Sequence, residues 1–307
     1  MTVVALRDVF GAALVERGLR DSNFVVVDAD NAPATRASNF IQRFPGRAVN
    51  VGCAEQNLVG VSAGIAATGI PTVATTFAIF LCGRAFEQIR NLVAQAMLPV
   101  TLVGTHAGVT VGHDGPSHFS VEDIALMRSV PGMQVLVASS SAQVAGLVDL
   151  AIESKRPTYI RISRHGTACR FSGPVSFAGI NRLRDGTDVT LITCGVLVDL
   201  CLEAAEALAT YGMSAEVLDI YSLKPLAEDA IAAALTRTGA AVIVEEHGVA
   251  GGLGEAVSHV LAQRHPTRLE HVCVRETLGR SGTPEAVLDL VGLTVPAVLA
   301  AVERVLK

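Results

Sequence analysis

A single glutamate lies in an otherwise apolar, glycine-bearing stretch, NVGCAEQNLVGVSAG, over residues 50–64. A carboxyl group in apolar surroundings is desolvated, which raises its pKa and allows it to donate a proton near neutral pH. Glu55 could therefore act as a general acid or base. The structural alternative is a glutamate in the first turn of a helix, where its charge favours the helix dipole.

A second group of reactive side chains occurs in THAGVTVGHDGPSHFSVED, residues 105–123. His106, His113, Asp114 and His118 lie in a glycine-rich loop after a predicted parallel strand, which is where open α/β sheets bind their ligands. A metal site, a polar-substrate loop and a solvated turn are all compatible with this composition. Because the glycines imply a loop shaped for close approach, the substrate loop is favoured.

Two further patterns resemble site motifs without their context. Gly60, Ser62 and Gly64 spell G-x-S-x-G, but a nucleophile elbow needs a strand before the serine, and AEQNLV has helical character. HGVAGGLG, residues 247–254, is not G-x-G-x-x-G and predicts a tight turn between a strand and a helix. Six scattered cysteines without a C-x-x-C pair indicate buried, reduced thiols.

The elements that must position these residues alternate between short β-branched runs and longer helical segments, which is typical of parallel α/β architecture. The pattern predicts strands at 24–28, 72–76, 99–105, 133–139 and 158–163, and helices at 4–18, 55–69, 82–97, 122–128 and 141–154.

The alternation stops after Arg164 in a polar stretch that contains glycine and proline, and it resumes at Asp188. We therefore predict two α/β domains, each a mostly parallel sheet with helices on both faces. The first covers residues 1–165, a linker covers 166–187, and the second domain covers 188–307.

Composition restricts the classes of function. The chain has 307 residues and a net charge of -5, without the basic runs that follow a nucleic-acid backbone. The charged start, MTVVALRDVF, and the lack of an uncharged apolar run of about 18 residues predict a cytoplasmic protein without a membrane span. A mean hydropathy of +0.46 with only 17% charged residues indicates a subunit with extensive interfaces.

The stretches singled out above, taken with their neighbours, resemble the transketolase family. NVGCAEQNLVGVSAGIAATG, TFAIFLCGRAFEQIR, THAGVTVGHDGPSHFSVEDIALMRSVPGMQV and YIRISR look like its pyrimidine-binding domain. ITCGVLVDLCLEAAEAL, DIYSLKPL, VIVEEHGVAGGLGEAV and GLTVPAVL look like its C-terminal domain. The resemblance covers nearly the whole chain in the family's order, and GRAFEQIR points to the split form, in which two chains make up the enzyme.

The resemblance implies that the chain binds thiamine diphosphate. Glu55 would hydrogen-bond to N1′ of the aminopyrimidine and favour the imino tautomer that removes the C2 proton of the thiazolium, so it is a predicted catalytic and cofactor-binding residue. Phe77 and Phe80 match aromatic positions that pack against the pyrimidine, where a flat ring gains from stacked or edge contacts. Asp30 matches an acidic residue near the cofactor at a subunit contact.

The same resemblance places substrate-binding residues. His106, Asp114 and His118 match positions that face the donor sugar and the reacting centre, and His118 is the second predicted catalytic residue. Arg7 and Arg164 match arginines that hold the sugar phosphate, a role that suits the planar, always-charged guanidinium.

Three departures from the family pattern leave the substrate open. Ala34, beside Thr35, stands where a serine usually joins the phosphate arginines. The loop reads GHDG in place of the usual GEDG, and ASSS at 138–141 replaces a stretch with proline and aspartate.

The resemblance also implies a missing half. The family binds the diphosphate and Mg2+ through a GDG motif followed by a downstream asparagine, and this chain has no such pair. We therefore predict a partner subunit that carries the diphosphate-binding domain, an α2β2 heterotetramer, and no metal ligands in this chain. The alternatives are the beta subunit of a 2-oxoacid dehydrogenase, against which HDGPSH and Arg164 argue, and a non-catalytic assembly subunit, against which Glu55, Phe77 and Phe80 argue.

Overall fold

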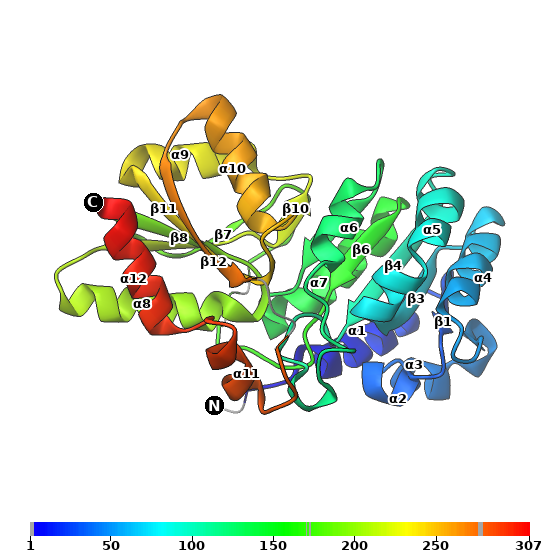
Figure 1. The fold of residues 1–307 in the computed structure, drawn as a ribbon. Helices are drawn as coiled ribbons and strands as arrows, with labels where there is room; N and C mark the ends of the chain where they lie inside the picture. The colour runs from blue at the N-terminus through cyan, green and yellow to red at the C-terminus, as the bar shows by residue number, and fades with distance from the viewer. Residues whose placement is uncertain (1–2, 170, 172, 276–278) are drawn as a thin grey trace.

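Two sheets lie side by side in the computed structural model, which describes residues 3–169, 171, 173–275 and 279–307 (Figure 1). The first sheet has seven strands in the order β10-β5-β6-β4-β3-β1-β2. Its first six strands along the chain pair parallel with one another. They are β1 (Val25–Asp28), β2 (Ala48–Asn50), β3 (Thr72–Phe77), β4 (Val100–Thr105), β5 (Gln134–Val137) and β6 (Thr158–Arg161).

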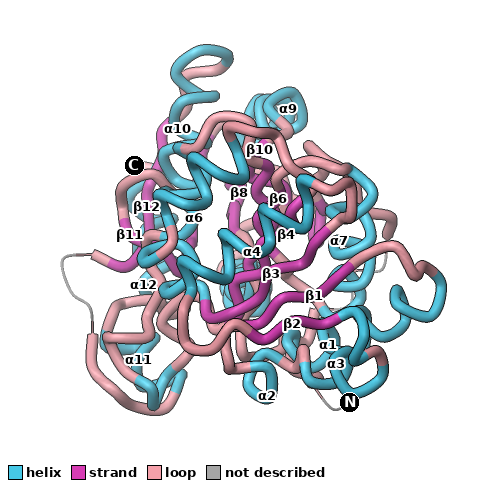
Figure 2. Tube along the Cα trace, turned by 90° about the vertical axis from the view of Figure 1, so that its right-hand side faces the viewer, coloured by secondary structure: helices cyan, strands magenta, loops and turns pink. Residues whose placement is uncertain are grey.

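Helices cover both faces of this sheet, as predicted (Figure 2). One face carries helices that pack on one another around Phe10, Phe40 and Leu147. They are α1 (Leu6–Arg20), α2 (Ala32–Thr35), α3 (Ser38–Arg43) and α7 (Ser141–Ser154). The other face carries α4 (Glu55–Ala67) and α6 (Asp123–Ser129), whose apolar residues pack against β3, β4 and β5.

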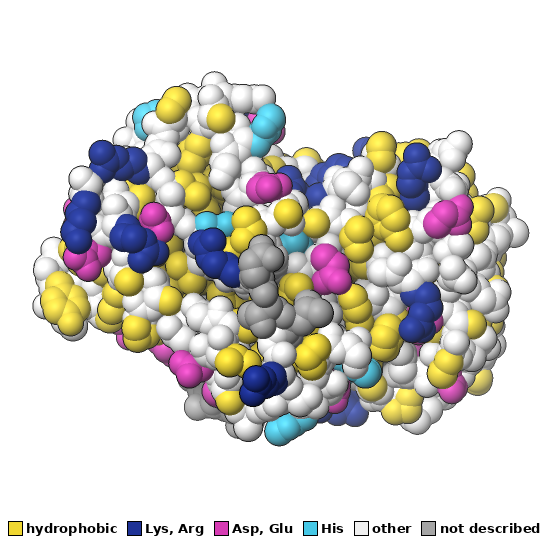
Figure 3. Space-filling view, in the orientation of Figure 1, with side chains coloured by type: hydrophobic (Ala, Val, Ile, Leu, Met, Phe, Trp, Pro, Cys, Tyr) yellow, Lys and Arg dark blue, Asp and Glu magenta, His cyan; other side chains and the backbone are white. Residues whose placement is uncertain are grey.

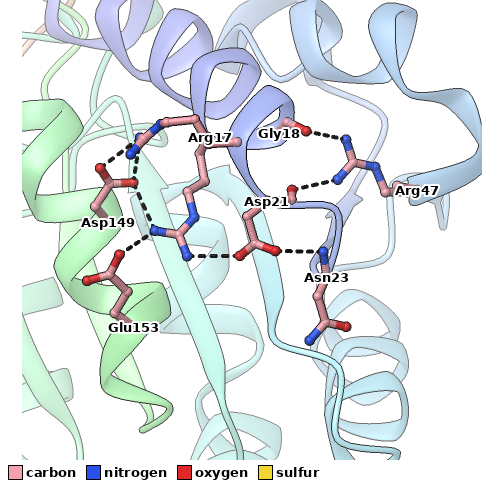
Figure 4. Close-up of polar contacts among 8 residues, drawn as sticks. Arg17, Gly18, Asp21, Asn23, Arg47, Asp149 and Glu153 are labelled. Atoms are coloured by element: carbon pink, nitrogen blue, oxygen red, sulfur yellow. Dashed lines mark hydrogen bonds and ion pairs between the residues drawn. The ribbon is translucent and has the colours of Figure 1, made fainter.

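Charged side chains join α1 to α7 at the edge of their contact (Figure 4). The Arg17 guanidinium donates to Asp21 at 2.9 Å, to Asp149 at 3.3 Å and to Glu153 at 2.6 Å. Arg20 adds a bond to Asp149 at 2.9 Å. These pairs fix how α1 lies on the sheet, and α1 begins one residue before Arg7.

The structure differs from the predicted single helix at 82–97. The structure has two π-helical segments, η2 (Phe80–Arg84) and η3 (Ile89–Ala94), with a short α5 (Phe86–Gln88) between them. Bonds from Gln95 N to the Arg90 carbonyl and from Leu98 N to the Val93 carbonyl span five residues. Gly83, which has low helix propensity, lies in η2, where a wider π-helical turn replaces the predicted regular helix.

The C-terminal domain contains a five-stranded sheet in the order β12-β11-β8-β9-β7. Its strands are β7 (Asn181–Arg184), β8 (Val189–Thr193), β9 (Ala215–Asp219), β11 (Ala240–Gly248) and β12 (Arg268–Val274). Helices α9 (Glu228–Thr238) and α10 (Leu253–Arg264) cover one face. Helices α8 (Val198–Thr210) and α12 (Val295–Leu306) cover the other, with α11 (Pro284–Leu290) and the 3-10 turn η5 (Gly195–Leu197) beside them.

Strand β7 lies inside the predicted linker, so the prediction of an irregular segment over 166–187 was wrong for these residues. β7 pairs antiparallel with β9 at the sheet edge. Its sequence, NRLR, has a single apolar residue between charged ones. An edge strand of this kind has too little apolar periodicity to be recognised from sequence.

The two domains also share a strand and a core. β10 (Ser222–Lys224) follows β9 of the C-terminal domain in the chain but pairs antiparallel with β5 of the first sheet. One apolar cluster continues from Leu58 and Leu102 in the N-terminal domain to Ile192 and Val257 in the C-terminal domain. The domains are therefore built against each other and do not merely follow one another.

Residues Pro284–Leu306 are apolar enough, and together long enough, to cross a membrane by composition. The structure divides them into α11 and α12, of 7 and 12 residues, and Val298 and Val302 of α12 are fully buried in the core beside α8. Neither helix reaches the roughly 20 residues that a span requires. We therefore interpret residues Pro284–Leu306 as helices that form part of the core of the C-terminal domain.

Hydrophobic side chains also interrupt the polar surface (Figure 3). Exposed examples on the N-terminal domain include Val49, Leu92 and Met97. Five of the six cysteines are buried, but Cys53 is exposed, so the prediction of buried thiols fails at this position.

Candidate active site

The candidate site lies where β3 and β4 end side by side. Phe77 at the end of β3 is in register with Thr105 at the end of β4, so the segments after them leave the sheet together. η2 begins at Phe80, and His106 begins the loop that carries Asp114 and His118. Parallel strands thus bring together residues about 30 positions apart in the chain, at the carboxyl edge where α/β sheets bind ligands.

Four rings form an aromatic group at this edge. The Phe77 and Phe80 rings are stacked with centroids 6.0 Å apart, and His106 stacks on Phe77 at 3.9 Å. His118 meets Phe80 edge-on at 5.2 Å and Phe77 at 6.0 Å. The phenylalanine rings are only partly buried, so an aromatic wall faces the site.

Glu55 is the first residue of α4 and is 4% exposed. Its Oε2 accepts a bond of 2.6 Å from Nη1 of Arg84, whose side chain is 54% exposed. The Arg84 guanidinium also lies 4.9 Å above the Phe80 ring. The expected apolar pocket is therefore incomplete, since one side of the carboxylate is covered by a cation.

Arg84 was not among the site residues predicted from the sequence, although it lies in GRAFEQIR. It follows Phe80 by four residues, and residues at that spacing share a helical face. That spacing was the available signal. Arg84 connects the carboxylate of Glu55 to the aromatic group, so the predicted pyrimidine-facing residues form one continuous set.

His106 has both ring nitrogens engaged. Nε2 lies 3.1 Å from Nη1 of Arg7, and Nδ1 lies 2.9 Å from Oγ1 of Thr105. Burial, with the nearby Arg7 and Arg164, lowers the pKa of His106 to about 3, so the ring is neutral at neutral pH. Because a guanidinium can only donate, Nε2 must accept from Arg7 and Nδ1–H must donate to Thr105.

This tautomer gives His106 a second role beside the predicted one. It holds the Arg7 guanidinium and stacks on Phe77, and a contact with a sugar hydroxyl through Nε2 would require Arg7 to move. His118 differs, because its Nδ1 lies 3.0 Å from Oγ of Ser117 while Nε2 has no hydrogen-bond partner among the described residues. His118 is therefore the better placed of the two for proton transfer.

The two predicted anion-binding arginines lie close to the loop. Arg7 Nη1 donates to the carbonyl of Ala34 at 3.3 Å, a contact that a serine at 34 would also offer through its backbone. Arg164 Nη1 donates to Asp114 at 3.1 Å and to the Val111 carbonyl at 3.4 Å. Burial and the guanidinium groups of Arg36 and Arg164 lower the pKa of Arg7, because like charges gather here.

Asp30 follows the end of β1, the strand that pairs with β3. It is exposed, in a left-handed backbone conformation with φ of 65°, and accepts a bond of 3.0 Å from Asn50. Its neighbour Asn31 donates to Thr76 at 2.8 Å, one residue before Phe77. Asp30 therefore lies at the rim, and any role with the cofactor stays a prediction.

These residues fit the pyrimidine half of thiamine diphosphate. Glu55 provides a buried carboxylate at a helix start, and Phe77 and Phe80 provide a partly exposed aromatic surface. Among the described residues, no three His, Cys, Asp or Glu side chains are grouped as metal ligands.

Comparison with known proteins shows the family of both domains. Residues 2–168 match the transketolase pyrimidine-binding domain, and residues 178–298 match the transketolase C-terminal domain. The chain belongs to the transketolase family. Such enzymes depend on thiamine diphosphate, and the resemblance noted in the sequence is confirmed.

Several relatives are single subunits of split enzymes. The chain is 38% identical to a putative transketolase C-terminal section of Methanocaldococcus jannaschii, over 94% of this chain and 92% of the relative. It is 36% identical to the 6-deoxy-6-sulfo-D-fructose transketolase subunit SqwH of Clostridium sp. (strain MSTE9), over 98% and 94%. It is 33% identical to one subunit of the apulose-4-phosphate transketolase of Phocaeicola vulgatus, over 85% of each chain.

A solved structure has the same fold over its whole length. It is described as a split gene transketolase, inactive beta4 tetramer, and it matches with a TM-score of 0.92 and 42% identity, over 99% of this chain and 98% of the other. The transketolase from Leishmania mexicana shares the fold with a TM-score of 0.82 over 47% of its chain. This chain is thus a transketolase-family subunit of the split type, which implies an N-terminal partner subunit and a multimer.

Proposed function

We propose that this chain is the C-terminal catalytic subunit of a two-chain transketolase. With a diphosphate-binding partner it transfers a two-carbon ketol unit from a ketose donor to an aldose acceptor. The observation that carries the proposal is the contact series from Glu55 through Arg84 and Phe80 to His118. It joins a buried carboxylate to an aromatic wall and to a histidine whose Nε2 is available for proton transfer.

On the cofactor side, thiamine diphosphate supplies a carbon acid that can act as nucleophile and then hold the transferred unit. Glu55 would hold a proton at N1′ of the pyrimidine, and Phe77 and Phe80 would fix the plane of that ring. Arg84 must share Oε2 of Glu55 or leave it when that bond forms. The partner subunit would hold the diphosphate and Mg2+.

On the substrate side, Arg7 and Arg164 would bind an anionic group on the sugar. Burial lowers the pKa of Arg7, and the nearby charges of Arg36 and Arg164 lower it further. An anion between Arg7 and Arg164 would offset the repulsion between their charges. The names of two relatives contain a sulfonated and a phosphorylated sugar, both anionic. We therefore propose an anionic ketose or aldose as substrate, with His118 moving protons at the reacting hydroxyl.

For the assembly we propose an α2β2 heterotetramer, located in the cytoplasm, in which each site lies between this chain and its partner. The exposed apolar side chains of the N-terminal domain support extensive subunit contacts. The beta subunit of a 2-oxoacid dehydrogenase and an assembly subunit remain the alternatives for the assay to exclude.

The test is reconstitution. This chain is mixed with its N-terminal subunit, thiamine diphosphate and Mg2+, and ketol transfer is measured between sugar phosphates. Activity should appear only in the mixture. Decarboxylation of a 2-oxoacid with transfer to a lipoyl protein, in place of ketol transfer, would establish the dehydrogenase alternative, and full activity of the partner without this chain would establish an assembly role.

A further inference from the structure

The loop with His106, Asp114 and His118 is held from the C-terminal domain. Its two ends meet in a backbone pair, Gly108 N to the Ser120 carbonyl at 3.0 Å and Ser120 N to the Gly108 carbonyl at 3.2 Å. Inside this closure, Val109, Val111 and Phe119 are buried in the apolar core of the C-terminal domain, beside Val244. The loop thus begins in one domain and packs in the other.

Glu246, at the end of β11, is the polar contact at the centre of this packing. It is 2% exposed, and its Oε1 accepts a bond of 2.6 Å from the backbone N–H of Thr110. The carboxylate rests on Gly108, where a Cβ atom would come within 2.1 Å of it and where φ is +84°. Only glycine permits both this backbone conformation and this approach.

Arg161 fixes Glu246 and the loop end together. Its Nη2 donates to the Ser120 carbonyl at 3.2 Å and to the Glu246 carbonyl at 2.9 Å. Its Nε donates to Asp123 at 2.9 Å, and its Nη1 lies 3.9 Å from Oε2 of Glu246. Gly248 N also donates to the Val121 carbonyl at 2.7 Å. The end of β11 is therefore hydrogen-bonded to both ends of the loop, near Thr110 and at Val121.

We propose that Glu246 is a positioning residue, which fixes the backbone at Thr110 and so places His106, Asp114 and His118 for the sugar substrate. The inference rests on the proposed function. The predicted cofactor and substrate residues all lie in the N-terminal domain. Glu246 would therefore be a contribution of the C-terminal domain to the site. This role requires a hydrogen-bond acceptor that reaches Thr110 N. Without the acceptor, the buried N–H of Thr110 would be unsatisfied, which disfavours the present position of the Thr110 backbone.

Four substitutions separate the effect of the length of the Glu246 side chain from the effect of its charge. Glu246→Gln keeps an acceptor at the same reach without the charge, and Glu246→Met keeps the volume without an acceptor. Glu246→Asp keeps the charge but is shorter by one methylene. Glu245→Met is the matched control, because Glu245 is equally buried on β11 but accepts bonds away from the loop, from Leu253 N, Gly254 N and His271.

Each variant is reconstituted with the partner subunit, and kcat, KM for the sugar and the cofactor Kd are measured. Glu246→Gln should keep kcat/KM within about threefold of wild type. Glu246→Met should lower it about tenfold or more through a raised KM, with the cofactor Kd unchanged, as expected when one buried hydrogen bond is lost. Glu245→Met should lower the melting temperature without this change in KM.

Hydrogen exchange of the Thr110 amide gives a readout that needs no activity. It should be protected in wild type and Glu246→Gln and exposed in Glu246→Asp and Glu246→Met. If Glu246→Met does not fold, the comparison of Glu246→Gln with Glu246→Asp decides on the proposal. The proposal predicts a higher kcat/KM for Glu246→Gln, whereas a role of charge alone predicts a higher kcat/KM for Glu246→Asp. Equal losses in Gln and Met, or the same KM change in Glu245→Met, would overturn the proposal. An inactive wild type with a protected Thr110 amide would refute the proposed function and leave the exchange pattern to decide on Glu246.

Discussion

The candidate site and the domain junction both bury carboxylates, but they pair them differently. At the candidate site, Glu55 has one bonded partner among the described residues, and that partner, Arg84, is more than half exposed. At the junction, Asp219 accepts bonds from Ser139, Gln143 and Asn181, all of them buried. The site is left to be completed by other molecules, whereas the junction is completed within the chain. Substitutions should therefore change chemistry at the site and stability at the junction.

Glu55→Gln should give the largest effect and should fall on chemistry alone. An amide cannot supply the proton at N1′, and general acid–base groups contribute about 10²- to 10⁴-fold to rate. We expect turnover of the reconstituted enzyme to fall by that factor while the melting temperature of the chain stays the same. Retention of more than about a tenth of wild-type turnover would contradict the role of Glu55.

Arg161→Met should lower the stability of the fold. Arg161 and Asp123 are both buried, and removal of the cation leaves the carboxylate uncompensated in the interior. Breaking such a pair costs about 3–5 kcal/mol. The free energy of unfolding in urea measures this loss, and Arg20→Met, which removes an exposed partner of Asp149, is the control with an expected loss below about 1 kcal/mol. Similar losses of stability in Arg161→Met and Arg20→Met would show that the buried pair at the junction contributes no more than an exposed pair.

Asp219→Asn should change how stability depends on pH. Burial raises the pKa of Asp219 to about 6 from its ordinary 3.8. Between these values the unfolded chain has released a proton that the folded chain keeps, so this group's contribution to stability falls as pH rises from about 4 to 6 and is constant above.

Unfolding of wild type and Asp219→Asn is therefore compared from pH 4 to 7, so that other titrating groups cancel in the difference. Over this range, wild type should lose about 2–3 kcal/mol relative to the variant. Parallel stability curves for the two proteins would show that Asp219 is ionised throughout.

Arg164→Ala tests the substrate end of the site. Loss of a charge-assisted bond to an anion removes about 1.5–3 kcal/mol of binding, or roughly tenfold or more in KM. We expect this rise for a phosphorylated or sulfonated sugar and no change for the same sugar without the anionic group. An equal change for both sugars would place the anion elsewhere.

Arg84→Gln should have only a small effect on stability, although it breaks the only bonded contact of Glu55 among the described residues. Pairs with a half-exposed partner contribute about 0–1 kcal/mol. A change of the melting temperature by no more than a few degrees is expected, and a loss above about 2 kcal/mol would show that the site is closed within the chain as the junction is.

The sequence predicted the parts of this comparison that have a local signal. Strands β1, β3, β4, β5 and β6 follow from apolar runs, and the loop after β4 follows from its glycines and histidines. β10 could not be predicted, because three residues carry no periodicity and their partner strand belongs to the other domain. The bond between Thr110 and Glu246 joins residues 136 positions apart, and nothing in VIVEEHG indicates which carboxylate turns toward the loop. The roles of the individual site residues stay predictions.

The most direct test is the exchange of the C2 proton of thiamine diphosphate in deuterated water, followed by NMR. The reconstituted wild-type enzyme should speed this exchange far above that of the free cofactor, and the partner subunit alone should not. Reconstituted Glu55→Gln should be slower than wild type by about 10²-fold or more. Exchange at the wild-type rate in Glu55→Gln would contradict the claim that this chain supplies the activating carboxyl group.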